Sequence, residues 1–283
     1  MPDKNKPLLR IGKIAYTNTF PIFYMLEKRF DCSKYEFIES VPSALNRLLR
    51  NGEIDISPSS SIEYLRYKER YTLIDGHSIS SQGPVRSIYL FSTRPIEELN
   101  GVTILTSSQS ETSVALLDII LKKFYGIECP LRPTERLMDL AESVIEAYLL
   151  IGDDALRAKK TITGFHVYDL GDLWYEHTAL PFVFALWIVR KETSTEKAEL
   201  FNALIRDLNR AKELALKNLY TIAQEWKKIL FSRYSLPVTE EELIFYWEGL
   251  SYDFSDEHKK GLEMFRKYSE ELGLLNKYSL TDR

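Results

Sequence analysis

Short apolar runs alternate with segments of helical hydrophobic spacing along the first hundred residues. Residues 17–21, Thr-Asn-Thr-Phe-Pro, predict the start of a helix that continues to about Lys28, because Asn or Thr followed by Pro marks a helix N-terminus. A second helix is predicted from Pro42 to Gly52, where the glycine is typical of a helix end. The predicted strands cover residues 8–16, 35–40, 54–57 and 87–92.

A third helix is predicted after residue 60, because Ser60 and Glu63 have the spacing of a capping box. Strands separated by helices of this length favour a largely parallel sheet with crossover helices. Residues 94–101 are predicted to lead the chain out of this first lobe.

The same alternation returns after residue 101. A helix capped by Ser108 is predicted to run to Tyr125, and the apolar run 180–190 is long enough to be a strand that returns to the first lobe. Further strands are predicted at 102–106, 147–151 and 166–170, and further helices at 195–216, 219–231, 240–248 and 256–272. We therefore predict an α/β fold, a two-lobed clamp with central mixed sheets. Residues 1–93 and 180–283 form the first lobe, with a helical C-terminal region, and residues 94–179 form the inserted second lobe.

Composition and charge agree with this architecture and limit the classes of partner that the protein could bind. The 283 residues exceed a usual single core. The net charge of −4, with both signs interspersed, gives no reason to expect nucleic acid or an anionic membrane as partner. The N-terminus is polar, and no segment approaches the roughly 20 apolar residues of a membrane span. We expect a cytoplasmic protein.

Sequence motifs for the common cofactors are absent. There is no GxxxxGK[ST], no GxGxxG after a strand, no HExxH and no GxSxG. Cys32 and Cys129 lack metal-ligand spacing, and the four histidines are scattered. We expect neither a metal site nor a cofactor.

Small polar residues gather where predicted strands meet helices. Asn18 follows the first strand, and the segments 57–61, 80–87 and 107–113 are rich in serine. Such junctions offer free backbone N–H groups and the positive end of a helix dipole, which suit a carboxylate. Each junction alone is explained by helix capping, since Ser and Asn favour these positions without any ligand. Four of them on two facing lobes favour an anion-binding cleft.

These segments resemble the chorismate dehydratases of the futalosine pathway of menaquinone biosynthesis. The resemblance covers about residues 8–190. The motifs that carry it lie at residues 14–21, 41–46, 52–58, 61–64, 83–87, 150–156, 169–174 and 180–185.

The resemblance implies the fold of type II periplasmic binding proteins and a lyase that needs no cofactor. Such an enzyme converts chorismate to 3-[(1-carboxyvinyl)oxy]benzoate and water. The resemblance implies that Asn18 and Ser87 are catalytic. It also implies that Ser110, Thr112 and Ser113 hold a substrate carboxylate. Ser59, Ser60, Asp153 and Pro181, which lie in or beside the matching segments, are expected as further substrate contacts. No titrating base stands at the motif positions, so we expect the enolpyruvyl carboxylate of the substrate itself to take the proton.

Two positions depart from the family pattern. Glu111 stands where Arg is common; as the third residue of a capping box from Ser108 it would face the helix end instead of the cleft. Ala179 stands where Gly is common.

Two other functions stay open from the sequence. The first is 1,4-dihydroxy-6-naphthoate synthase of the same pathway, whose family carries a His-Glu pair where this chain has Gly152-Asp153-Asp154. The second is a non-catalytic cytoplasmic protein that binds a small carboxylate. The oligomeric state does not follow from the sequence.

Overall fold

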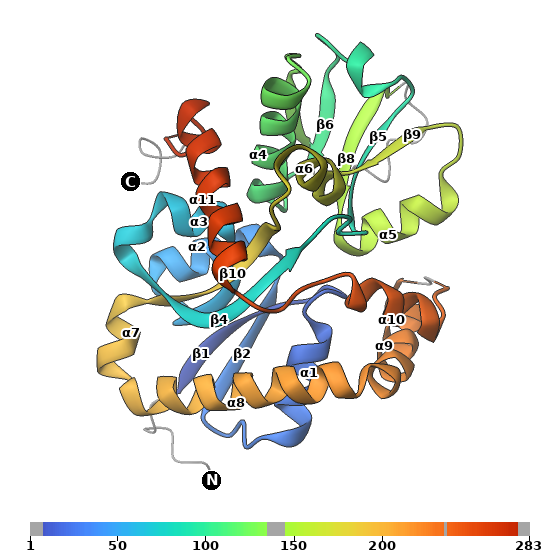
Figure 1. Cartoon of the computed structure of the whole chain (residues 1–283). Helices are drawn as coiled ribbons and strands as arrows, with labels where there is room; N and C mark the ends of the chain where they lie inside the picture. Colours follow the sequence, from blue (N-terminus) through green and yellow to red (C-terminus); the bar gives the residue numbers. More distant parts are fainter. Residues whose placement is uncertain (1–7, 135–144, 235–236, 277–283) are drawn as a thin grey trace.

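Two five-stranded sheets, one in each lobe, form the framework of the protein (Figure 1). The computed structural model describes residues 8–134, 145–234 and 237–276, so the polar segment 1–7 lies outside the described residues. The first sheet has the order β2-β1-β3-β10-β4, and the second has the order β7-β6-β8-β5-β9. The strands are β1 (Leu9–Ile14), β2 (Tyr35–Ser40), β3 (Ile56–Ser60), β4 (Tyr71–Ser81), β5 (Ile88–Ser92), β6 (Ile104–Ser107), β7 (Leu131–Thr134), β8 (Ala147–Ile151), β9 (His166–Asp169) and β10 (Phe182–Arg190).

Both sheets share one pattern of strand directions. Three neighbouring strands run parallel, β2, β1 and β3 in one sheet and β7, β6 and β8 in the other. The fourth strand, β10 or β5, is antiparallel to both of its neighbours. Each of these two strands is the first that the chain forms after crossing from the other lobe. The predicted mixed sheets, and the return of residues 180–190 to the first lobe, are confirmed.

The predicted place of residues 87–92 in the first lobe is wrong. These residues form β5, which pairs with β8 and β9 in the second sheet. The chain therefore leaves the first sheet after Ser81, before residues 94–101. The strand that takes the expected place is β4, which the sequence analysis missed because polar residues around Gly76 interrupt its hydrophobic alternation. Gly76 has a φ of +74°, and the pairing of β4 with β10 jumps there from Ser78 to Leu73.

Helices cover both sheets, and most begin where the sequence predicts them. The helix predicted from residue 17 is α1, and the helix between Pro42 and Gly52 is α2, with Gly52 at a φ of +76° as its C-cap. The helices are α1 (Phe20–Arg29), α2 (Pro42–Asn51), α3 (Ser61–Arg66), α4 (Glu111–Ile119), α5 (Gly152–Thr161), α6 (Leu170–Thr178), α7 (Lys191–Glu196), α8 (Ala198–Lys217), α9 (Leu219–Tyr234), α10 (Glu240–Glu248) and α11 (Asp256–Glu271). Short helical turns are η1 (Lys68–Arg70), η2 (Ile96–Glu98) and the π-helical η3 (Ile120–Phe124), which continues α4.

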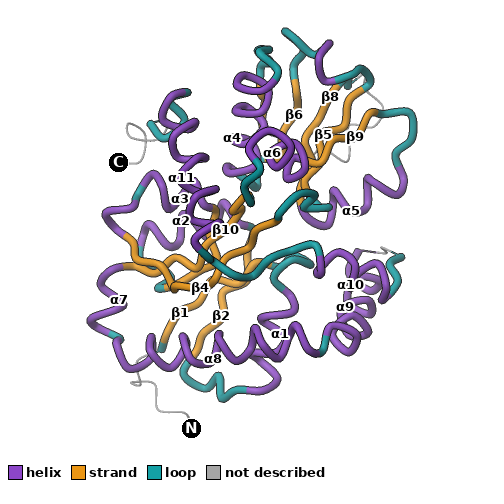
Figure 2. Tube along the Cα trace, in the orientation of Figure 1, coloured by secondary structure: helices purple, strands orange, loops and turns teal. Residues whose placement is uncertain are grey.

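The C-terminal helices support both lobes rather than forming a separate unit (Figure 2). Helix α8 packs along α1 under the first sheet, and α9 contacts α1, α8 and α10. Helix α11 packs against β10, α3 and α4, so it touches elements of both lobes. Within the described ranges, no helix combines the length and the apolar character needed to cross a membrane.

Both predicted capping boxes are wrong. Ser60 makes no side-chain cap at α3, and the Glu63 carboxylate instead accepts hydrogen bonds from Arg50 (2.6 Å) and Tyr71 (2.9 Å) in the core. Helix α4 begins two residues later than expected, and its cap is Ser110 rather than Ser108. Glu63 is thus held by tertiary partners, whereas α4 uses a different local cap, in which Ser110 accepts from the N–H group of Ser113.

The departure at Ala179 has a backbone explanation. Ala179 ends α6 in the left-handed conformation, at a φ of +55°, a region that glycine occupies without steric cost. An alanine there is strained by about 1–2 kcal/mol.

We predict that Ala179→Gly stabilises the protein by about 0.5–1 kcal/mol, because relief of this strain exceeds the extra entropy of glycine in the unfolded chain. Urea unfolding at equilibrium measures the change. Ala203→Gly, inside α8, is the matched control and should destabilise by a similar amount. Destabilisation by both variants would contradict the account of Ala179.

Candidate active site

A cavity of ≈ 60 Å³ lies between the two lobes, and both contribute to its wall. We call it the interlobe cavity. It is lined by Ile14, Tyr16, Asn18, Pro42, Ser60, Ile79, Val85, Ser87, Ile88, Ser110, Ser113, Ile151, Gly152, Phe184, Ala185 and Leu250. None of these lining residues carries a charged side chain. A charge that develops on a bound ligand must therefore be met here by hydroxyls, amides and helix dipoles.

Five of the nine predicted site residues line this cavity together. Asn18 lies in the turn between β1 and α1, and its side-chain oxygen Oδ1 is buried without a hydrogen-bond partner within the described residues. Ser87 ends the crossing from the first lobe to the second and is 3 % exposed. Ser60, Ser110 and Ser113 complete the set. The cavity thus collects hydroxyl and amide groups from elements that are far apart in the sequence.

The start of α4 faces the cavity with two linked hydroxyls. Ser110 caps the helix by accepting a hydrogen bond from the N–H group of Ser113 (3.3 Å), and the two Oγ atoms are 2.9 Å apart. The positive end of the helix dipole and these hydroxyls suit the carboxylate of a ligand.

The other predicted residues lie outside the cavity wall. Ser59 is fully buried and precedes Ser60 on β3, so it points to the opposite face of the sheet. The hydroxyl of Thr112 accepts a hydrogen bond from the N–H group of Ile62 (3.1 Å) and so joins α4 to the first lobe. Pro181 is buried, and its carbonyl lies so close to Gly261 on α11 that a Cβ at Gly261 would clash with it.

Asp153, also predicted, lies behind the cavity wall, where α5 begins. It is 6 % exposed and accepts a hydrogen bond from the N–H group of Thr17 (3.2 Å) through Oδ1. Its Oδ2 is buried without a partner within the described part of the chain. Burial raises the pKa of this carboxyl to about 6. Asp153 thus connects the second lobe to the turn that holds Asn18.

Polar contacts across the cleft hold the lobes together. The hydroxyl of Tyr16 donates to the side-chain oxygen of Gln109, and the ring of Tyr16 lies over Gly152. Arg66 forms an ion pair with Glu111, so the carboxylate of Glu111 is drawn towards the first lobe. Glu111 therefore does not face the interlobe cavity, where its charge would repel a bound anion.

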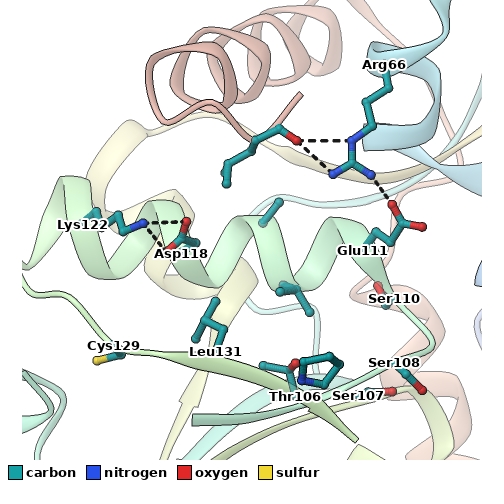
Figure 3. Close-up of a pocket in the computed structure, with 14 residues that line it drawn as sticks. Arg66, Thr106, Ser107, Ser108, Ser110, Glu111, Asp118, Lys122, Cys129 and Leu131 are labelled. Carbon is teal, nitrogen blue, oxygen red and sulfur yellow. Dashed lines mark hydrogen bonds and ion pairs between the residues drawn. The ribbon is translucent and has the colours of Figure 1, made fainter. Parts of the chain in front are cut away.

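A second cavity, of ≈ 360 Å³, runs along α4 and shares Ser110 with the first (Figure 3). Its charged side chains are already paired with one another or with the backbone. Arg66 also donates to the carbonyl of Leu274 (2.9 Å), and Lys122 pairs with Asp118 (2.9 Å). This cavity therefore offers a ligand few free charges despite its larger size.

Comparisons with known proteins place the chain in a family. Residues 9–271 match the model of the family described as menaquinone biosynthesis. The chain belongs to this menaquinone biosynthesis family. A curated relative, the chorismate dehydratase of Thermus thermophilus, is 32% identical over 232 residues, which cover 76% of this chain and 80% of that protein. The resemblance found in the sequence is confirmed.

Solved structures confirm the fold of this family member. Protein AF1704 from Archaeoglobus fulgidus has a TM-score of 0.75 and 19% identity, covering 94% of this chain and 98% of that one. The alkanesulfonate-binding protein SsuA from Xanthomonas axonopodis pv. citri bound to MOPS has a TM-score of 0.70 and 17% identity, with 96% of both chains covered. The periplasmic aliphatic sulphonate binding protein SsuA from Escherichia coli has a TM-score of 0.66 and 15% identity, covering 96% and 95%. The periplasmic-binding-protein-like clamp is therefore shown.

Sequence reasoning missed the aromatic residues that support the site of this family member from behind. Tyr246 in α10 donates its hydroxyl hydrogen to Ser87 Oγ (2.9 Å), and Tyr252 donates to the main-chain oxygen of Asn18 (2.8 Å). These tyrosines lie in the C-terminal region, outside the segments that carry the resemblance. By pattern, Tyr246 in α10 is indistinguishable from an ordinary core residue, and Tyr252 lies beyond the end of that helix.

The loop before Ser87 is held in an unusual conformation. Arg86 has a φ of +60°, and its guanidinium lies 3.6 Å from the ring centre of Phe245. The carboxylate of Asp169 accepts hydrogen bonds from the N–H groups of Val85 (2.9 Å) and Arg86 (2.6 Å). These contacts fix the direction in which Ser87 enters the cavity.

We predict that Asp153→Asn raises the melting temperature relative to the native protein at neutral pH but not at low pH. The pKa of the buried carboxyl rises from 3.8 to about 6 on folding. The folded state therefore keeps a proton that the unfolded chain releases, and stability falls as pH rises from about 4 to about 6. Asparagine lacks this loss, which amounts to as much as about 3 kcal/mol.

Thermal unfolding from pH 4 to pH 8 measures the effect as the difference between variant and native protein. Any cost of the unpaired amide is independent of pH, so the change of this difference with pH is the test. Asp154→Asn, at a side chain that is 46% exposed, controls for the loss of one negative charge. A constant difference for Asp153→Asn would show that its carboxyl stays ionised in the folded state.

Proposed function

We propose that this chain is a chorismate dehydratase, a hydro-lyase that converts chorismate to 3-[(1-carboxyvinyl)oxy]benzoate and water. The observation that carries the proposal is the interlobe cavity, in which Asn18, Ser87 and the start of α4 meet in a member of the menaquinone biosynthesis family. The relative from Thermus thermophilus, which is named a chorismate dehydratase, supports the choice of substrate. We further propose a cytoplasmic location, as the resemblance implies.

The reaction requires groups that respond to developing negative charge. Removal of the proton at the ether-bearing ring carbon spreads negative charge towards the ring carboxylate, and loss of the neighbouring hydroxyl then makes the ring aromatic. The dipole of α4 and the hydroxyls of Ser110 and Ser113 would stabilise a substrate carboxylate, which we take to be the ring one. Asn18 and Ser87 would orient the departing hydroxyl.

We propose that the proton is taken by the enolpyruvyl carboxylate of chorismate itself. The cavity wall carries no ionisable carboxylate or imidazole, which supports an internal base. The protein then contributes mainly by holding the reactive conformer, which is an effective source of rate when both reacting groups belong to one molecule. The elimination transfers no electrons to an acceptor, so the proposal includes no cofactor.

The interlobe cavity is small for this ligand, because pockets for molecules of this size hold about 300 Å³ or more. The lobes are closed on each other through Tyr16, Asp153 and Glu111. We propose that these contacts separate to admit chorismate and form again around it.

A direct assay tests the function. Purified, chelator-treated protein is mixed with chorismate, and the products are followed by ultraviolet absorbance and mass spectrometry. We expect a product lighter than chorismate by one water. Binding of chorismate without turnover would instead favour the non-catalytic binding protein, which the likeness to alkanesulfonate-binding proteins makes the second candidate. If chorismate is neither converted nor bound, the result would favour the remaining alternative, the 1,4-dihydroxy-6-naphthoate synthase of the same pathway.

We predict that Asn18→Ala lowers kcat for chorismate about 100-fold, because one preorganised hydrogen-bonding group is lost at the reacting centre. Steady-state kinetics of both proteins measure the change. Asn51→Ala, at an exposed asparagine on α2, is the matched control and should keep the native rate. Native turnover by Asn18→Ala would remove Asn18 from the site.

A further inference from the structure

Tyr246 approaches the proposed reacting centre from behind the cavity wall. It lies in α10, is 4% exposed, and does not line the interlobe cavity. Its hydroxyl donates a hydrogen bond of 2.9 Å to Ser87 Oγ, which does line the cavity. Tyr246 therefore contacts a proposed catalytic group without reaching the ligand space.

This contact decides what Ser87 can do. A serine hydroxyl has one hydrogen to donate and two lone pairs to accept with. The hydrogen bond from Tyr246 occupies one lone pair of Oγ, which leaves the hydrogen of Ser87 available. The acceptor that the local backbone offers, the carbonyl of Val85, is 3.5 Å away, beyond the distance of a strong hydrogen bond.

We propose that Tyr246 is a positioning residue that makes Ser87 a hydrogen-bond donor towards the departing hydroxyl of the substrate. A donor at Oγ polarises the O–H bond of Ser87, because hydrogen bonds in a chain strengthen one another. The inference rests on the proposed function, since it concerns the same site and the same reaction.

The surroundings of Tyr246 suit a permanent donor. Burial raises the pKa of its phenol far above the ordinary value, so the group keeps its hydrogen at every pH at which the protein works. The same segment is fixed by two further hydrogen bonds, from Trp247 to the carbonyl of Thr17 (2.7 Å) and from Tyr252 to the carbonyl of Asn18 (2.8 Å). Residues 246–252 thus hold Ser87 and the turn that carries Asn18 in fixed positions relative to each other.

The step balances as a simple elimination. The C–H bond at the ether-bearing carbon breaks, its electron pair forms the new ring double bond, and the adjacent C–O bond breaks. The oxygen leaves with its own hydrogen and combines with the abstracted proton to give water. Ser87 lends a hydrogen bond to that oxygen while its charge develops, and no proton is exchanged permanently with Tyr246.

A double-mutant cycle tests the assignment. We expect Tyr246→Phe to lower kcat about 10-fold with KM changed less than about 2-fold, since it removes one hydrogen bond that matters in the transition state. In a Ser87→Ala background the same substitution should change kcat less than about 2-fold, because Tyr246 acts through Ser87. Equal effects in both backgrounds, or a change in KM alone, would overturn the inference.

Two further variants keep the test decisive. Tyr35→Phe removes a phenol hydroxyl that donates to Asp207 (2.6 Å) far from the cavity, and it calibrates the stability cost while kcat stays native. Tyr252→Phe removes a hydroxyl from the same segment, but its acceptor is the carbonyl of Asn18, so its effect on kcat should be equal with and without Ser87. Loss of that effect in the Ser87→Ala background would show that the segment acts as one support and that Tyr246 has no separate role.

Turnover of chorismate by the native protein is measured first. An inactive native protein refutes the proposed function, whereas an active one with additive Tyr246 and Ser87 effects refutes only the role of Tyr246.

Discussion

The hydrogen bonds of Thr17 connect three parts of the molecule at one buried residue. Its N–H group donates to Asp153 of the second lobe, its carbonyl accepts from Trp247 in α10, and its hydroxyl accepts from Trp226 in α9. Because Thr17 is 1% exposed, water cannot replace a missing partner. The turn that carries Asn18 therefore takes its position only when the second lobe and the C-terminal helices are both in place.

The neutral wall of the interlobe cavity follows from the same arrangement. Charged groups near the cleft form contacts between or within the lobes, as Glu111 does with Arg66. What remains towards the ligand space is a set of hydroxyls, an amide and the start of α4. Such groups can donate hydrogen bonds to a carboxylate and to a departing hydroxide without acting as the base, which fits a reaction that supplies its base from the substrate.

The order of strands and helices explains why five of the nine residues predicted from the sequence line one cavity. Asn18, Ser87 and Ser110 follow or precede strands at junctions that the hydrophobic pattern marks clearly. Junctions of this kind in a two-lobed α/β fold converge on one cleft. Ser59 and Thr112 were predicted with them, yet they lie outside the cavity wall. The direction of a side chain at a junction depends on the register of the strand or helix. A shift of one residue reverses it on a strand and turns it by about 100° on a helix.

By itself, the sequence determined the α/β alternation, the starts of α1 and α2, the serine-rich junctions and the family, because each depends on residues close together in the chain. Only the tertiary structure decided which sheet receives β5, which partner takes Glu63 and Glu111, and which aromatic residues stand behind the cavity. Tyr246 and Ser87 are 159 residues apart, and Trp226 and Thr17 are 209 apart. Hydrogen bonds between residues so far apart cannot be predicted from hydrophobic periodicity. The local pattern around each residue indicates only the helix face or turn in which its side chain lies.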